Sequence, residues 1–149
     1  MKSNLRSFAL AAAAALASLT PALHAQTIQA QANVPFSFDY GTTHFSQGTY
    51  VITMNGDSVL VVRNRVTNQS AMVLARLETS PIPAENGLAT FKKYGDRWFL
   101  EHVEIAGSGN SVSVYESKAE RQAAHELALR GGEATQVALA LLPETGFGK

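Results

Sequence analysis

Short runs of valine, threonine and aromatic residues, separated by glycine, asparagine and aspartate, constrain the fold of this chain more than any other feature. Glycine tolerates the positive φ of a tight hairpin turn, so Asn55-Gly56-Asp57 and Gly95-Asp96 predict two such turns. Strands joined this tightly run antiparallel. Six runs are predicted as strands: 34–40, 49–54, 59–65, 71–77, 88–94 and 97–105. The sequence therefore predicts an all-β or β-rich fold: an antiparallel sandwich or partly open barrel of six to eight strands, with one helix packed on it.

The first predicted hairpin has a preferred register. One register places the apolar side chains of both strands on one face and the nearby arginines in solvent. The apolar set is Tyr50, Ile52, Leu60 and Val62, and the arginines are Arg63 and Arg65. A one-residue slip would turn both arginines toward the core, where an unpaired charge is costly. We therefore expect the first register, which requires an odd-length loop between the two strands.

A helix is predicted near 117–130. Ser117 and Glu120 have the spacing of a capping box, in which the two side chains satisfy backbone amides of the first turn. Gly131-Gly132 would end the helix. Mostly small residues recur at helical spacing, which lets the helix lie close on a sheet. This stripe comprises Ala119, Ala123, Ala124, Leu127 and Ala128.

Three further segments are less regular in pattern. The apolar run 135–142 fits either a last strand or a helix, and periodicity does not decide between them. Prolines and an Asn-Gly pair predict an irregular segment at 78–87, and small polar residues predict another at 106–111.

The first 25 residues have the pattern of a secretory signal peptide. Lys2 and Arg6 precede an apolar, alanine-rich run, and the segment ends in the small residue Ala25. Cleavage there would leave 26–149 as a single β-rich domain with a polar C-terminal tail. No later segment reaches the roughly 20 apolar residues of a membrane-spanning helix. We therefore expect a periplasmic or secreted protein with no membrane span in the mature chain.

Composition excludes several classes of mechanism. The chain has no cysteine, which rules out disulfides, thiolate metal sites, a cysteine nucleophile and a lipid-modified N-terminal cysteine. Without Lys2 and Arg6 the chain carries ten basic and twelve acidic residues. Nucleic-acid binders carry a basic excess, so no nucleic-acid partner is expected.

His102-Val103-Glu104 is the pattern closest to a metal site. Its imidazole and carboxylate lie two residues apart, on one face of a predicted strand, and His44 or His125 would have to complete the ligand set. His44, His102 and Glu104 are thus the candidate ligands, although ordinary surface polarity also accounts for them. His-x-Glu also begins the zinc deaminase signature, but that signature requires cysteines. No cofactor is expected.

Hydrolase patterns are absent. No Gly-x-Ser-x-Gly turn positions a nucleophilic serine, and Gly107-Ser108-Gly109 is interpreted as a flexible linker before the helix. Glu101 and Glu104 differ by three positions, so on a regular strand they would face opposite sides and not form a catalytic pair.

Three aromatic residues, Tyr94, Trp98 and Phe99, cluster around the predicted Gly95-Asp96 turn. Such a cluster can form a contact surface for sugars or peptides, or fill the end of a β fold. Trp98 and Phe99 alternate along a strand, so at most one of them can face the interior.

Four motifs resemble a family of small exported bacterial proteins of unknown function. They are Val34-Pro35-Phe36-Ser37-Phe38, Gly48-Thr49-Tyr50-Val51-Ile52, the segment 91–100 with Tyr94-Gly95-Asp96 and Phe99-Leu100, and Ser117-Lys118-Ala119-Glu120-Arg121. The resemblance covers roughly 34–128. Family members carry Leu-Pro-Ala before Gly-Thr-Tyr, where this chain has Phe45-Ser46-Gln47, and Leu-Pro before the helix, where it has Val114-Tyr115-Glu116. The resemblance implies a compact β domain closed by a helix, and no catalytic residues.

Leu142-Pro143-Glu144-Thr145-Gly146 matches the pentapeptide that sortases recognise. A sorting signal also needs a membrane-spanning run and a basic tail, whereas Phe147-Gly148-Lys149 follows here. We therefore expect this match to be coincidental.

These patterns favour a non-enzymatic exported module that binds a partner protein or envelope component through a sheet edge or face, because exposed edges invite strand addition. One alternative is a carrier with a small apolar ligand inside a barrel. Another is a metal-assisted enzyme that uses His102 and Glu104. The oligomeric state is left open.

Overall fold

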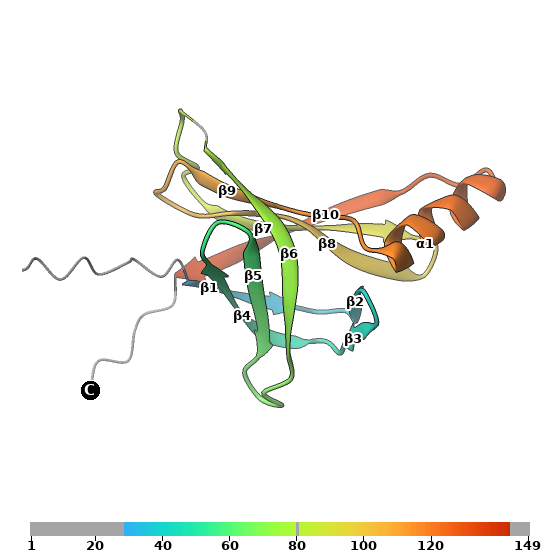
Figure 1. The fold of residues 1–149 in the computed structure, drawn as a ribbon, viewed down its shortest axis with the longest axis horizontal. Coiled ribbons are helices and arrows are strands. Elements are labelled where there is room, and N and C mark those ends of the chain that lie inside the picture. The colour runs from blue at the N-terminus through green and yellow to red at the C-terminus, as the bar shows by residue number, and fades with distance from the viewer. Residues whose placement is uncertain (1–28, 80, 144–149) are drawn as a thin grey trace, which may run out of the picture.

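The computed structural model describes residues 29–79 and 81–143, which form ten strands and one helix (Figure 1). The strands are β1 (Gln29–Val34), β2 (Phe38–Tyr40), β3 (Thr43–Phe45), β4 (Gly48–Asn55), β5 (Val59–Asn64), β6 (Ser70–Thr79), β7 (Gly87–Tyr94), β8 (Arg97–Glu104), β9 (Asn110–Val114) and β10 (Thr135–Pro143), and the helix is α1 (Lys118–Leu129). The predicted signal peptide, 1–25, and positions 144–146 of the sortase-like pentapeptide lie outside the described residues.

Eight of the strands close into an antiparallel barrel, in the order β1-β4-β5-β6-β9-β8-β7-β10 and back to β1. The C-terminal strand β10 therefore lies between β7 and β1. The remaining strands, β2 and β3, form a small hairpin that pairs with β8 through Asp39 and Phe99. The predicted class, an antiparallel β fold of up to eight barrel strands with a helix on it, is confirmed.

Five of the six predicted strands overlap β4 to β8. The predictions for 34–40 and for 107–109 were wrong. The run 34–40 is not one strand, because Pro35 has no N–H to continue the ladder and β2 begins only at Phe38. Gly107-Ser108-Gly109 is not a linker before the helix but the turn between β8 and β9. The apolar run 135–142, which periodicity left open, is strand β10.

The expected register of the β4–β5 hairpin is confirmed. Ile52 pairs with Val62, and Tyr50 pairs with Asn64 on the same face. Asn55 pairs with Val59, so the loop has three residues, an odd number. Gly56 supplies the positive φ of this loop, at 66°.

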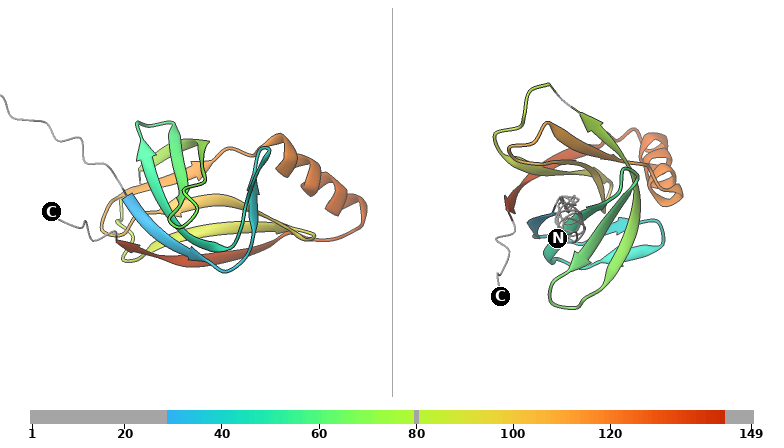
Figure 2. Two further views of the ribbon diagram at one scale, coloured as in Figure 1. Left: turned by 90° about the horizontal axis from the view of Figure 1, so that it is seen from below. Right: turned by 60° about the vertical axis from the view of Figure 1, so that its left-hand side comes forward.

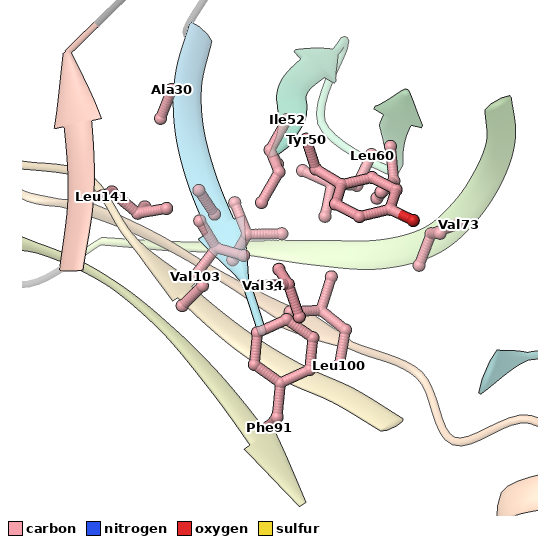
Figure 3. Close-up of a cluster of buried hydrophobic side chains, with 14 of the residues drawn as sticks. Ala30, Val34, Tyr50, Ile52, Leu60, Val73, Phe91, Leu100, Val103 and Leu141 are labelled. Carbon is pink, nitrogen blue, oxygen red and sulfur yellow. The ribbon is translucent and has the colours of Figure 1, made fainter. Parts of the chain in front are cut away.

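Side chains fill the barrel interior (Figure 3). Inward residues of every barrel strand contribute, and Tyr50, Phe91 and Val103 are each at most 1% exposed. An eight-stranded barrel encloses a space just wide enough for side chains. Burial of these apolar groups, at about 25 cal/mol per Å², is the main stabilising term for a chain without disulfides.

The β2–β3 hairpin covers one end of this core. Phe38 and Phe45 stack with ring centroids 4.8 Å apart, and both rings meet Tyr50 edge-on. On the solvent side, the Asp39 carboxylate accepts a hydrogen bond of 2.9 Å from Arg97. The hairpin thus completes the aromatic end of the core while its polar side faces water.

The helix α1 lies on the outside of the barrel, against β7 and β8 (Figure 2). It starts as expected, since the Ser117 hydroxyl oxygen accepts the Glu120 backbone N–H at 3.1 Å. Ala123, 5% exposed, packs on Tyr94 and Phe99. The small side chain lets α1 approach the sheet closely. Within the described part of the chain, no helix is both long and apolar enough to cross a membrane.

Replacing Ala123 with Leu should therefore overpack the contact between α1 and the barrel. We expect Ala123→Leu to lower the free energy of unfolding by about 1 to 3 kcal/mol in urea denaturation. Ala128→Leu is the matched control, because Ala128 is on the same helix but exposed, and it should change stability by less than about 0.5 kcal/mol. Equal effects of the two substitutions would mean that α1 is not docked.

Candidate functional site

A polar groove lies on the outer face of the barrel where the chain leaves β9 for α1. It has a volume of about 440 Å³ and is open to solvent. Four strands and the β9–α1 connection contribute its lining: Thr90, Glu101, His102, Ser113, Val114, Glu116 and Gln136. The groove holds most of the acid, base and hydroxyl groups that a catalytic or ligand site would need.

A β-bulge in β8 builds this groove. Thr90 pairs with His102 but the next residue, Phe91, pairs with Leu100, which leaves Glu101 as the extra residue. Leu100 and Val103 both point into the core, so Glu101, His102 and Glu104 share the outer face. The expectation that Glu101 and Glu104 face opposite sides was therefore wrong, because it assumed a regular alternation.

Neighbouring groups occupy both oxygens of the Glu101 carboxylate. Lys92 Nζ lies 3.1 Å from Oε1, and Gln136 Nε2 donates to Oε2 at 2.6 Å. Side chains from β7 and β10 thus hold the Glu101 carboxylate of β8 in place. These contacts tie three adjacent strands together on the outside of the barrel.

His102 lies between a hydroxyl and a carboxylate. Its Nδ1 is 3.2 Å from Ser113 Oγ, and its Nε2 is 3.8 Å from Glu104 Oε1. The order serine, histidine, acid resembles that of a hydrolase triad. Ser113, however, pairs with Arg76 on one side and His102 on the other, so its strand lies inside two backbone ladders. Backbone amides that are hydrogen-bonded within a ladder do not supply an oxyanion hole. Ser113, His102 and Glu104 therefore form a polar contact between β8 and β9.

Glu120, in the first turn of α1, is a buried acidic residue. The residue is 3% exposed, although it carries a group that is ionised in water at neutral pH. Burial, assisted by the nearby Glu116 carboxylate, raises the pKa of Glu120 to about 7, while Lys92 and a hydrogen bond from the Ser117 backbone oppose this shift. Glu120 therefore gains or loses its proton near neutral pH, although the residue is buried.

The stability of the protein should reflect this buried acid. Below pH 4.5 Glu120 is protonated in both the folded and the unfolded chain. Between pH 4.5 and 7 the unfolded chain loses the proton first, so the folded state becomes less stable as the pH rises. Glutamine keeps the capping pattern without the charge. We expect Glu120→Gln to gain about 2 kcal/mol over the wild type between pH 4.5 and pH 8, measured by urea denaturation at both pH values.

The exposed residue Glu126 provides the control on the same helix. Glu126→Gln should track the wild type at both pH values. A Glu120→Gln variant that showed the same pH dependence as the wild type would mean that Glu120 ionises normally.

The candidate metal ligands occupy two separate arrangements. His44 lies on β3, where its Nδ1 is 2.6 Å from Asp39, which also binds Arg97. His102 and Glu104 lie together on β8, next to Ser113. Within residues 29–79 and 81–143, no group of three or more histidine, aspartate or glutamate side chains is placed to hold a metal ion. The structure thus does not bring His44 together with His102 and Glu104.

The aromatic residues around the β7–β8 turn lie on both sides of the barrel wall. Tyr94 and Phe99 pack beneath α1 and are 8% and 1% exposed. Trp98 points to the interior side, where it stacks on Phe36 with ring centroids 4.3 Å apart, and it is half-buried. Helix and core packing therefore account for most of the surface of these three rings.

An exposed apolar patch lies on the outer face of β5 and β6. Its members are Val59, Val61, Met72, Leu74 and Tyr115, and we call it the outer patch. Met72 pairs with Val61, and Leu74 pairs with Val59. Met72, Leu74 and Tyr115 are 74%, 60% and 54% exposed, although all three are large hydrophobic residues.

The sequence interpretation missed the outer patch, although a signal was present. Residues 71–75, Ala-Met-Val-Leu-Ala, are all apolar, whereas a strand with one wet face alternates apolar and polar residues. Val73 and Ala75 point inward and are buried, so the outward Met72 and Leu74 are not needed for the core. An unbroken apolar run on a strand of this kind indicates a second, outward apolar surface.

No protein-family model, no curated protein and no solved structure matches this chain.

Proposed function

We propose that this protein is an exported, non-enzymatic binding module that holds a partner protein against the outer patch. The signal-peptide pattern of residues 1–25 supports export to the periplasm or medium. The motif resemblance supports membership of a family of small exported bacterial proteins. The mildly acidic chain that would remain after residue 25 favours a protein partner over a nucleic acid.

The observation that carries the proposal is the exposure of Met72 and Leu74 side by side on a regular strand. Both side chains stand on the outer face, and two half-buried valines of β5 lie beside them. Contiguous apolar surface on a soluble domain marks an interaction site, because each Å² covered contributes about 25 cal/mol. Met72 adds a flexible, polarizable side chain that adapts to a partner surface.

Two other functions receive less support from the geometry. A carrier for a small apolar ligand needs interior space, whereas aromatic and aliphatic side chains occupy the barrel interior. A metal-assisted enzyme that uses His102 and Glu104 needs further ligands, whereas within residues 29–79 and 81–143 no group of three or more histidine, aspartate or glutamate side chains is placed to hold a metal ion. A module with an outward binding face requires neither an interior cavity nor a catalytic site.

Site-specific photo-crosslinking tests the proposal. We expect a crosslinking amino acid at position 72 or 74 to trap one discrete partner protein in the native host, because both positions lie in the outer patch. The same amino acid at Gln122, exposed on α1, serves as the control and should trap nothing discrete. Met72→Glu should abolish crosslinking from position 74 without changing the melting temperature, since Met72 makes little contact with the core. Identical crosslinks from positions 74 and 122 would contradict the proposal.

A further inference from the structure

Part of the β6 edge has no neighbouring strand. On one side, β5 pairs with Ser70 to Leu74. On the other side, β9 pairs with Ala75 to Thr79 only, and after Tyr115 the chain turns away into α1. The N-terminal half of β6 is therefore paired on one edge and open on the other.

The direction of the backbone groups at this edge follows from Leu74. Its N–H donates to the Tyr40 hydroxyl at 2.9 Å, and its carbonyl accepts the Tyr115 N–H at 3.0 Å, so both point away from β5. Backbone groups alternate between the two edges of an antiparallel strand, so those of Ser70 and Met72 point the same way. Within the described residues, no backbone or side-chain group pairs with them.

We propose that an extended segment of the partner protein adds to β6 as a strand, along Ser70 and Met72. This inference rests on the proposed function and specifies how the partner binds. Two N–H donors and two C=O acceptors, presented on alternate residues, match the backbone of an extended peptide. The added strand would continue the ladder that β9 already forms with β6 from Ala75 onward.

The surroundings of the open edge favour a single strand over a second copy of the barrel. Gln69 Nε2 donates to the His44 carbonyl at 2.9 Å, and Tyr40 reaches Leu74 from β2. The β2–β3 hairpin therefore bounds both ends of the open edge. A second barrel would meet this hairpin, whereas one extended segment is narrower than a barrel and would displace only the hairpin contacts at the two ends of the edge.

Charge adds a preference for the sequence of the segment. Arg63 is exposed on β5, opposite Ser70, and forms no ion pair with the described residues. Ser70 is small, so the guanidinium can reach over it to the added strand. The partner segment should therefore carry apolar residues that extend the outer patch beside Met72, and an aspartate or glutamate beside Ser70.

The experiment separates backbone pairing from side-chain contact at one residue. The Met72 N–H is not used by β5, so Met72→Pro removes the outward donor without breaking the β5–β6 ladder. Met72→Ala is the matched control, because it removes the side chain and keeps the donor. The probe is the peptide acetyl-Asp-Thr-Val-Thr-Val-Thr-amide, in which Asp and both valines share one face, together with a version N-methylated on alternate residues. Binding is measured by isothermal calorimetry and by NMR shifts of the Ser70 and Met72 amides.

We expect the unmethylated peptide to bind the Met72→Ala variant more weakly than the wild type, because the outer patch loses a side chain, and to bind the Met72→Pro variant at least tenfold more weakly than Met72→Ala, because the backbone donor is lost as well. The N-methylated peptide should bind the wild type at least tenfold more weakly, which tests the edge even if Met72→Pro fails to fold. Equal binding of both peptides, or no binding, would overturn strand addition. So would self-association of the wild type that Met72→Pro abolishes, because the occupant would then be a second copy. If crosslinking from position 74 persisted in any of these cases, the outer patch would remain the binding site and only its mode would be wrong.

Discussion

The pairing of β10 with β1 is the interaction on which the rest of the structure depends. It joins the C-terminal strand to the N-terminal one and closes eight strands into a barrel. Closure satisfies the backbone of two strands that would otherwise be edges, and it encloses a core that side chains fill. Because the interior is filled, α1 has to pack on the outside, where it covers Phe99 and Tyr94.

The same closure is why we propose that a partner binds on the outer surface. The polar groups of β7 to β10 contact one another: Glu101 is held by Lys92 and Gln136, and His102 by Ser113. Such contacts tie neighbouring strands together on the outside of the barrel. The barrel wall is incomplete where β9 departs, and the open edge of β6 and the outer patch meet there. A backbone edge and an apolar face in one place are the features that recognise an extended peptide.

Local patterns in the sequence predicted the local parts of this fold. The β4–β5 register followed from keeping Arg63 and Arg65 out of the core, and the start of α1 followed from Ser117. Features that depend on distant partners were not predictable in this way. The segment 135–142 becomes a strand because β7 and β1 flank it, and the bulge at Glu101 carries no glycine or proline to mark it. Of the candidate site residues, His102 and Glu104 do lie together, whereas His44 lies with Asp39.

Amide hydrogen exchange along β6, followed by NMR in the free protein, tests the central claim most directly. The claim is that a closed and filled barrel leaves the edge of β6 open at Ser70 and Met72. The alternate amides of Ala71 and Val73 face β5 and should exchange at least about 100-fold more slowly than those of Ser70 and Met72. Uniform protection of all four amides would contradict the claim, because the edge would then already be paired.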